Sequence, residues 1–328
     1  MRAGICGVGK TSEEMVNNYD LRTIGTYTGT KKGPLMIAIG GLHGNELAGV
    51  HALETLFRML EEEPRRNPDF QFKGTFIGLR GNLRALRNGS RQMVKDLNRQ
   101  FTTDNINRVL QFPESFLDEE DMELKELYLI IISLLRQYRP TKLVIIDLHT
   151  TSASGGIFSI VSDHPESLRI ATALHVPVIK GLMNGLSGTT MHFFNKHNLG
   201  IDTIAMGFEA GQHEDPLSVS RSIAAVVNCM RAVGCVRRKD VESKHDIILK
   251  EYARGLPKVT EVLSAHHIAP GDAFAMAPGF INFQAVKAGQ VLANDQHGAI
   301  LAPEDCLILM PLYQKQGSEG FFLVREVG

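Results

Sequence analysis

Two histidines and a glutamate occur at positions where they could bind a metal ion together. His43 and Glu46 are three residues apart and follow the apolar run 35–39 and a glycine turn. A second apolar run, residues 143–146, is followed shortly by His149. Two histidines and one glutamate form a set of zinc ligands that leaves a fourth coordination position for water. The pattern predicts one zinc ion (Zn2+) per chain, bound by His43, Glu46 and His149.

A separate carboxylate, Glu209, follows a third apolar run, residues 201–208. The carboxyl ends of the strands of an open α/β sheet form the edge at which ligands bind. If the three apolar runs are strands of one sheet, Glu209 lies near the metal ligands. A glutamate there can take the proton of a zinc-bound water molecule, so the pattern predicts metal-assisted hydrolysis.

Strands and helices are expected to alternate along most of the chain. Buried apolar runs predict strands at residues 23–29, 34–40, 74–79, 143–148, 155–161 and 201–208. Apolar residues at helical spacing and helix-start signals predict helices at residues 46–60, 119–138, 165–174, 189–198 and 216–233. The segment Glu61-Glu62-Glu63-Pro64 is expected to end the first helix, and residues 83–105 to form a loop. This order predicts an α/β fold with a mostly parallel or mixed sheet flanked by helices.

The pattern changes after about residue 240. From residue 280 onward, short alternating segments are separated by turns, which is typical of all-β structure. We therefore expect a catalytic zinc hydrolase domain over residues 1–240 and a smaller C-terminal β domain over residues 241–328.

The composition excludes several classes of partner. The 328 residues carry a formal net charge of −1, which gives no electrostatic reason to expect nucleic acid or an anionic membrane as a partner. No apolar run approaches the roughly 18 residues of a membrane span, and the N-terminus lacks the apolar segment of a signal peptide. The four cysteines, Cys6, Cys229, Cys235 and Cys306, form no CxxC pair and are expected to be free thiols. These features predict a cytoplasmic protein.

The segment Gly4–Thr11 matches the phosphate-loop pattern GxxxxGK[ST]. That loop requires a buried strand immediately before it, and only three residues precede this one. We interpret the match as a coincidence.

The motifs together resemble those of the succinylglutamate desuccinylase/aspartoacylase family, relatives of the zinc carboxypeptidases. The matching segments are Gly-Gly-Leu-His43-Gly-Asn-Glu46, Arg91 with Asp96-Leu-Asn98-Arg99, Asp147-Leu-His149-Thr-Thr-Ser, and Glu209-Ala-Gly-Gln212. The tail is also similar, from Val286-Lys-Ala-Gly289 to Met310-Pro-Leu-Tyr313. The resemblance covers most of the chain and implies a zinc carboxypeptidase-like fold.

The resemblance also implies roles for individual residues. His43, Glu46 and His149 would be the zinc ligands, and Glu209 the general base that passes the proton of water to the leaving amine. Arg91 would polarise the scissile carbonyl and hold the oxyanion.

Three more residues would bind the substrate. Asn98 and Arg99 would bind a carboxylate, for which the planar guanidinium fork is well shaped. Tyr313 would contact the substrate from the C-terminal domain. Asp147 lies two residues before His149 on the same strand face, where it could hydrogen-bond the polar groups of the site or serve a structural role. His213 could line the mouth of the site.

The sequence departs from aspartoacylase at two points. Aspartoacylase has an arginine about ten residues before the base glutamate, whereas residues 196–200 here contain none. Gln212, directly after Glu209-Ala210-Gly211, stands where the family usually has a proline. N-acetylaspartate is therefore not the expected substrate, and Lys196 or His197 could bind a different acid group.

The first functional hypothesis is a zinc-dependent deacylase that hydrolyses the amide bond of a small N-acyl amino acid or a similar carboxylate. The alternative within the same chemistry is a metallocarboxypeptidase acting on peptides. A zinc-binding protein without turnover is a third hypothesis, against which the presence of Glu209 and Arg91 argues. A C-terminal domain that covers the cleft would favour small substrates. The chain could form a homo-oligomer.

Overall fold

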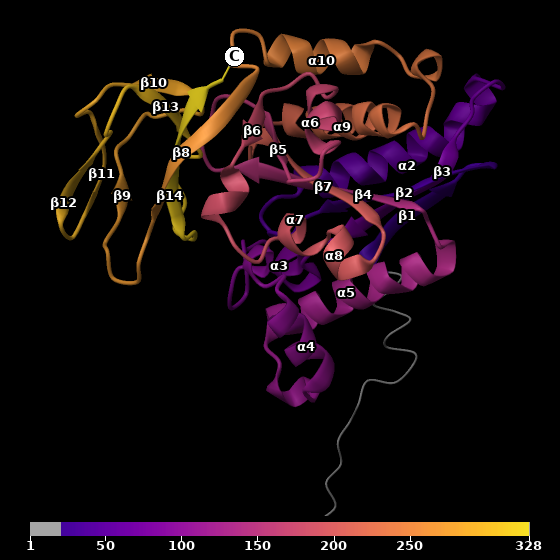
Figure 1. Ribbon diagram of the computed structural model, residues 1–328, viewed down its shortest axis with the longest axis horizontal. Coiled ribbons are helices and arrows are strands. Elements are labelled where there is room, and N and C mark those ends of the chain that lie inside the picture. Colours follow the sequence, from indigo (N-terminus) through magenta and orange to yellow (C-terminus); the bar gives the residue numbers. More distant parts are fainter. Residues whose placement is uncertain (1–20, 328) are drawn as a thin grey trace, which may run out of the picture.

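The structure is a computed structural model, and it describes residues 21–327 (Figure 1). The phosphate-loop match Gly4–Thr11 and Cys6 lie outside the described residues. A large mixed sheet occupies the centre, helices cover both of its faces, and a smaller sheet lies at the C-terminal end.

The large sheet has eleven strands. In spatial order they are β1 (Thr23–Thr28), β3 (Lys73–Arg80), β2 (Lys31–Gly40), β4 (Lys142–Thr151), β7 (Asp202–Gln212), β5 (Phe158–Val161), β6 (Val178–Lys180), β8 (Val259–His267), β14 (Glu319–Glu326), β13 (Cys306–Leu309) and β10 (Gln284–Val286). The four central strands β3, β2, β4 and β7 pair in parallel. Antiparallel pairs join β1 to β3, β5 to β7, and β8 to β14 and the strands beyond it.

The central strands are apolar on both faces because helices cover both sides of the sheet. Leu143 and Ile145 of β4 face one core, and Val144 and Ile146 face the other. One face packs against α2 (Ala48–Arg66), α6 (Ser167–Thr172), α9 (Leu217–Val233) and α10 (Lys244–Tyr252). The other carries α3 (Leu83–Asn88), α4 (Thr103–Gln111), α5 (Glu119–Tyr138), α7 (Thr190–Phe193) and α8 (Lys196–Leu199). Short 3-10 helices are η1 (Leu97–Arg99), η2 (Glu114–Phe116), η3 (Leu182–Gly185) and η4 (Arg238–Asp240).

The C-terminal region adds a second antiparallel sheet. Its strands are β12 (Gly298–Leu301), β11 (Val291–Asp295) and β9 (Ala275–Met276). A separate apolar core lies between it and the end of the large sheet. The expected fold class, a mixed sheet flanked by helices with C-terminal β structure, is confirmed. Strands β8, β14, β13 and β10, which follow residue 241, continue the large sheet. The division into domains at residues 240 and 241 stays a prediction.

Three expectations about the local structure were wrong. The expected loop 83–105 contains α3, η1 and the start of α4. Helix α3 forms because its ends are capped: the Asn82 side chain accepts from the Ala85 N–H, and Gly89 closes the helix in the left-handed conformation. Helix α2 continues through Pro64 to Arg66, and the Asn67 N–H bonds to the Glu63 carbonyl oxygen to close its last turn.

The expected helix 189–198 is two short helices, α7 and α8. The chain leaves helical geometry between them, and the side chain of Asn195 caps the second helix by accepting from the N–H of Asn198. Among the helices of residues 21–327, none combines the length and apolar character needed to cross a membrane.

Candidate metal centre and active site

The turn between β2 and α2 carries His43 and Glu46. Its backbone is held by hydrogen bonds from the Glu46 N–H to the His43 carbonyl oxygen, 3.1 Å, and from the Gly44 N–H to the Arg91 carbonyl oxygen, 3.1 Å. A side chain at Gly44 would meet the backbone of Ala85 at 2.1 Å, so only glycine permits this close approach to α3. The turn is therefore fixed against α3 with both potential ligands directed to one point.

The register of the central sheet places His149 beside Glu209. The two residues are Cα partners at the ends of the parallel strands β4 and β7. Strand β2, which leads to His43, pairs with β4 on its other side. The expected meeting of strand ends is thus present, and it joins residues far apart in the sequence.

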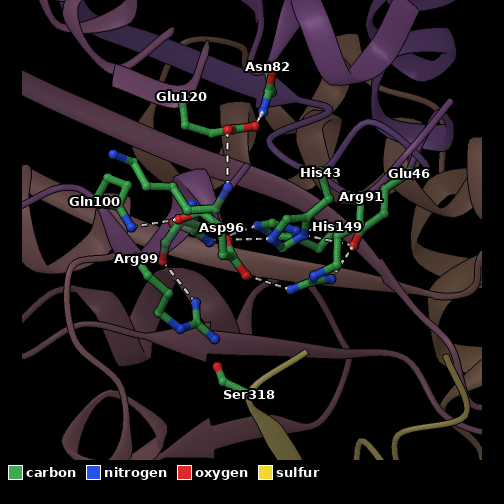
Figure 2. Close-up of polar contacts among 12 residues, drawn as sticks. His43, Glu46, Asn82, Arg91, Asp96, Arg99, Gln100, Glu120, His149 and Ser318 are labelled. Atoms are coloured by element: carbon green, nitrogen blue, oxygen red, sulfur yellow. Dashed lines mark hydrogen bonds and ion pairs between the residues drawn. The ribbon is translucent and has the colours of Figure 1, made fainter. Parts of the chain in front are cut away.

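His43, Glu46 and His149 are buried, and each offers a ligand atom within 4.8 Å of the others. Nδ1 of His43 lies 2.8 Å from Oε1 of Glu46, and Nδ1 of His149 lies 3.0 Å from Oε2 (Figure 2). Two imidazoles and a carboxylate suit zinc among the divalent metals. The geometry provides a three-residue cluster that could hold one metal ion.

The second nitrogen of each imidazole faces another carboxylate. Nε2 of His43 lies 3.0 Å from Oδ1 of Asp96, and Nε2 of His149 lies 2.9 Å from Oδ2 of Asp147. The Thr190 hydroxyl donates to the same Asp147 oxygen at 2.9 Å. Such outer carboxylates orient metal-binding histidines and make them better ligands. The sequence analysis left two roles open for Asp147, a contact with the site or a structural role, and it missed the equivalent contact of Asp96.

Neighbouring charges shift the pKa values of the ionisable groups in the cluster. Burial acts to raise the pKa of Glu46, but the adjacent His43 and His149 outweigh it and hold that pKa well below its usual value. Burial acts to lower the pKa of His149, but Asp147 and Glu46 raise it well above its usual value. The carboxylates of the cluster therefore favour a positive charge at this place.

Glu209 is buried beside the cluster and differs from Glu46 in its environment. Its Oε2 atom is buried and has no hydrogen-bond partner. Burial is the main cause that raises the pKa of Glu209 to about 7; Glu46 and Asp147 also raise it, while the histidines oppose them. A carboxylate with a pKa near neutrality can both accept and return a proton.

Arg91 reaches the cluster from the segment that follows α3. Its Nη2 donates to Oδ2 of Asp96 at 2.9 Å, and its Nη1 lies 3.5 Å from Oε1 of Glu46. The buried Glu120 of α5 holds this segment by accepting from the N–H groups of Met93 at 2.7 Å, Val94 at 2.8 Å and Lys95 at 3.2 Å. Figure 2 also shows its contact with Asn82, which donates at 3.0 Å. Glu120 is thus a positioning residue that the sequence analysis did not single out.

Asn98 and Arg99 both line the cavity at the cluster and already have partners. The Asn98 Oδ1 accepts from the Thr190 N–H at 3.0 Å. Arg99 forms a two-point ion pair with Glu319 of β14, from Nη2 to Oε2 at 2.8 Å and from Nε to Oε1 at 3.3 Å, and its Nη1 donates to the Asn98 carbonyl oxygen at 2.8 Å. Of the five N–H groups of a guanidinium, these contacts leave two for a ligand.

The other candidates lie outside the residues that line the cavity. The Tyr313 hydroxyl accepts from the Phe280 N–H and donates to the Ala277 carbonyl oxygen, each at 2.8 Å. Its neighbour Gln314 lines the cavity instead. His213 lies behind that wall, with Nε2 3.3 Å from Oε1 of Gln314 and Nδ1 2.7 Å from the Thr150 hydroxyl. The substrate-binding role of Tyr313 stays a prediction.

Lys196 and His197, the residues considered for a second acid group, are exposed on α8. Neither lines the cavity beside the metal cluster. The cavity has a volume of about 90 Å³, and β14 and the segment before it form part of its wall. The C-terminal region therefore contributes directly to the site.

Residues 32–232 match the model of the succinylglutamate desuccinylase/aspartoacylase catalytic domain. This match covers more than half of the chain, and the protein belongs to the succinylglutamate desuccinylase/aspartoacylase family. The match includes His43, Glu46, His149 and Glu209, so the family resemblance first seen in the motifs is confirmed.

Individual relatives agree with this assignment. A probable aspartoacylase of Nostoc sp. is 29% identical over 125 residues, which are 38% of each chain. A probable aspartoacylase of Trichodesmium erythraeum is 32% identical over 145 residues, 44% of this chain and 45% of the relative. The aligned regions thus span less than half the length of these curated relatives. A crystal structure of a succinylglutamate desuccinylase/aspartoacylase from Rhodobacter sphaeroides shares the fold, with a TM-score of 0.63 and 18% identity over 90% of this chain and 87% of that chain.

Proposed function

We propose that the protein is a zinc-dependent amidohydrolase that removes the acyl group from a small N-acyl amino acid or a similar carboxylate. The observation that carries this proposal is the position of Glu209. Its unpartnered, buried carboxylate oxygen lies beside a cluster of two histidines and a glutamate. A metal site with an adjacent carboxylate of raised pKa is suited to hydrolysis.

His43, Glu46 and His149 would hold the zinc ion. A bound zinc ion lowers the pKa of water to about 7 and polarises carbonyl groups. The fit rests on the donor set, on the buried cluster of ligand atoms, and on Asp96 and Asp147, which orient the two imidazoles. These features describe a metal-binding site better than a histidine pair that merely fills a core.

Glu209 would act as the general base and then as the general acid. It takes a proton from the attacking water and returns it to the leaving amine, which lets the C–N bond break. Its burial raises the pKa of the carboxyl group, which favours uptake of the proton from water. Arg91, which borders the cavity, would stabilise the negative charge that develops on the scissile carbonyl oxygen.

Asn98 and Arg99 would bind a carboxylate of the substrate, and Tyr313 remains a further candidate. Two N–H groups of Arg99 are free of the contacts with Glu319 and Asn98, which is enough for one carboxylate. The cytoplasmic location and the oligomeric state stay predictions from the sequence.

The wall that the C-terminal region forms at the cavity supports deacylase activity over carboxypeptidase activity. Leu312, Glu319 and Phe322 of the C-terminal region close one side of a cavity of about 90 Å³. A peptide needs an extended cleft on both sides of the scissile bond, whereas a small N-acyl compound does not.

The direct test is amine release from a panel of N-acyl amino acids and short peptides. The protein is first freed of metal with a chelator and is then assayed with and without one equivalent of zinc. We expect zinc-dependent release of amine from N-acyl amino acids and little cleavage of peptides. Cleavage of peptides alone would favour the carboxypeptidase, and no zinc-dependent cleavage of any compound would contradict the proposed function.

A further inference from the structure

One part of the cavity wall is apolar. Five apolar side chains from four elements and a connecting segment line it: Ile160 of β5, Leu182 of η3, Leu186, Met191 of α7 and Phe322 of β14. Four of them are less than 9% exposed, and all five belong to or pack against the same hydrophobic core. This wall is a rigid, preformed surface, because its side chains are held by the core behind it.

The apolar wall comes close to the proposed general base. Gly207 lies two residues before Glu209 on β7, so the two residues face the same side of the sheet. A methyl group at Gly207 would lie 3.4 Å from Cε of Met191 and 3.5 Å from Cδ1 of Ile160. A substrate placed for attack beside Glu209 therefore has Met191 and Ile160 as neighbours.

Within residues 21–327, the cavity lining contains two arginines and no lysine. Arg91 is paired with Asp96, and Arg99 is paired through two hydrogen bonds with Glu319. Glu319 thus occupies the fork of Arg99 much as a carboxylate ligand would. The cavity retains donors for one carboxylate and has no unpaired cation for a second.

We infer that the substrate carries an aliphatic group next to its scissile amide and at most one carboxylate. This inference rests on the proposed deacylase function and narrows its substrate class. The aliphatic group lies against Met191, Ile160 and their neighbours, where a second carboxylate would lose its hydration without gaining a cation.

Two pairs of substrates of equal chain length test the inference with zinc-loaded wild-type protein. N-butanoylglycine is compared with N-succinylglycine, which varies the acyl group. N-acetylnorvaline is compared with N-acetylglutamate, which varies the amino acid. We expect the aliphatic member of at least one pair to have a kcat/KM at least about tenfold higher, since single methylenes in apolar pockets change it about 10- to 200-fold.

Met191→Ala and Met183→Ala provide a matched pair of variants. Both methionines are buried in the same core, 7% and 8% exposed, but only Met191 lines the cavity. We expect Met191→Ala to change the ratio of kcat/KM between the aliphatic substrate and a homologue two methylenes longer by at least about tenfold in favour of the longer one. Met183→Ala should leave that ratio unchanged.

The wild-type comparison decides the inference even if a variant does not fold. Equal or higher kcat/KM for the diacid in both pairs overturns the inference while leaving the deacylase function intact. Amine release from none of the four compounds, with zinc-dependent release from other N-acyl amino acids of the panel, overturns the inference alone. No zinc-dependent release from any compound of the panel overturns the proposed function and the inference together. A ratio that changes equally in both methionine variants would show that Met191 does not contact the aliphatic group, which also contradicts the inference.

Discussion

Glu46 and His149 are 103 residues apart in the sequence, yet Oε2 of Glu46 lies 3.0 Å from Nδ1 of His149. The same oxygen accepts a hydrogen bond of 2.9 Å from the N–H of Thr150. The contact exists because β2 and β4 are neighbours in the sheet and end at the same edge. The proposed metal site thus depends on the register of the central strands.

His43→Ala and His149→Ala should each lose most of the bound zinc, because two remaining ligands hold the ion too weakly. His51→Ala is the matched control, since that side chain is 55% exposed on α2 and lies outside the cluster. The measurement is elemental analysis after zinc loading and dialysis. Full zinc occupancy in both cluster variants would show that the metal ligands are other residues.

Glu120→Gln should lower kcat/KM about 10- to 100-fold, as changes to supporting groups of metal sites do. The amide presents a donor to backbone N–H groups that now share a carboxylate, so the segment bearing Arg91 and Asp96 loosens. Glu119→Gln is the control, because its side chain is 50% exposed and bonds to Arg84 instead. The measurement is steady-state kinetics of both variants, made on samples whose zinc content equals that of the wild type. A normal kcat/KM in Glu120→Gln would show that Glu120 does not position the segment that bears Arg91.

Arg99→Ala should raise the activation free energy by roughly 2–5 kcal/mol for substrates with a free carboxylate, and by little for their methyl esters. Glu319→Gln should act in the opposite direction and lower KM for the free acid, because it removes the competing carboxylate from Arg99. Glu304→Gln, whose side chain is 52% exposed, is the control for Glu319→Gln. We would compare kcat/KM for acid and ester in each variant. Equal losses on both substrates in Arg99→Ala would show that Arg99 does not bind that carboxylate.

Asp121→Asn should lower the free energy of unfolding by about 1.5–3 kcal/mol at pH 7, as charge-assisted hydrogen bonds contribute. Burial acts to raise the pKa of Asp121, but the hydrogen bonds and charges of Arg108 and Lys95 outweigh burial and lower this pKa to about 2. Because the pKa of Asp121 is lower in the folded protein than in the unfolded chain, where it is near 4, the ionised carboxylate stabilises the fold fully above about pH 4. This stabilisation is lost as the pH falls towards 2. Urea unfolding of both proteins between pH 7 and pH 2.5 should show the difference shrink only below about pH 4. If the difference in the free energy of unfolding between wild type and Asp121→Asn stayed constant over this pH range, the charge of Asp121 would not be its cause.

Elements with strong local signals were predicted closely from the sequence. Helix α5 spans Glu119–Tyr138, the predicted range, because the Asp118 side chain caps its start and Arg139-Pro140 ends it. The central strands were recognised because burial on both faces produces continuous apolar runs. Helix α3 was missed because it buries only Leu83 and Ala85 and depends on its caps.

The proposed metal ligands and Glu209 could be found because each lies in the last part of a strand or just after it, and strand ends in a parallel sheet converge. The partners of Arg99 and Arg91 could not be found in this way. Glu319 reaches Arg99 only because β14 joins the sheet 220 residues further along the chain. Glu120 resembles a surface residue at the start of a helix, yet it is fully buried against the segment it supports. Such contacts depend on tertiary packing, which has no local signal.

Glu209→Gln tests the central claim most directly. The amide has nearly the same shape but cannot accept the proton of water, so the protein should keep its fold and its zinc and lose about 10²- to 10⁴-fold in kcat. The measurement is amine release from the best N-acyl amino acid, made with wild type and variant at equal zinc content determined on the same samples. A loss of that size with full zinc occupancy is the predicted result. Near-normal turnover by zinc-loaded Glu209→Gln would contradict the account and place the general base at another residue.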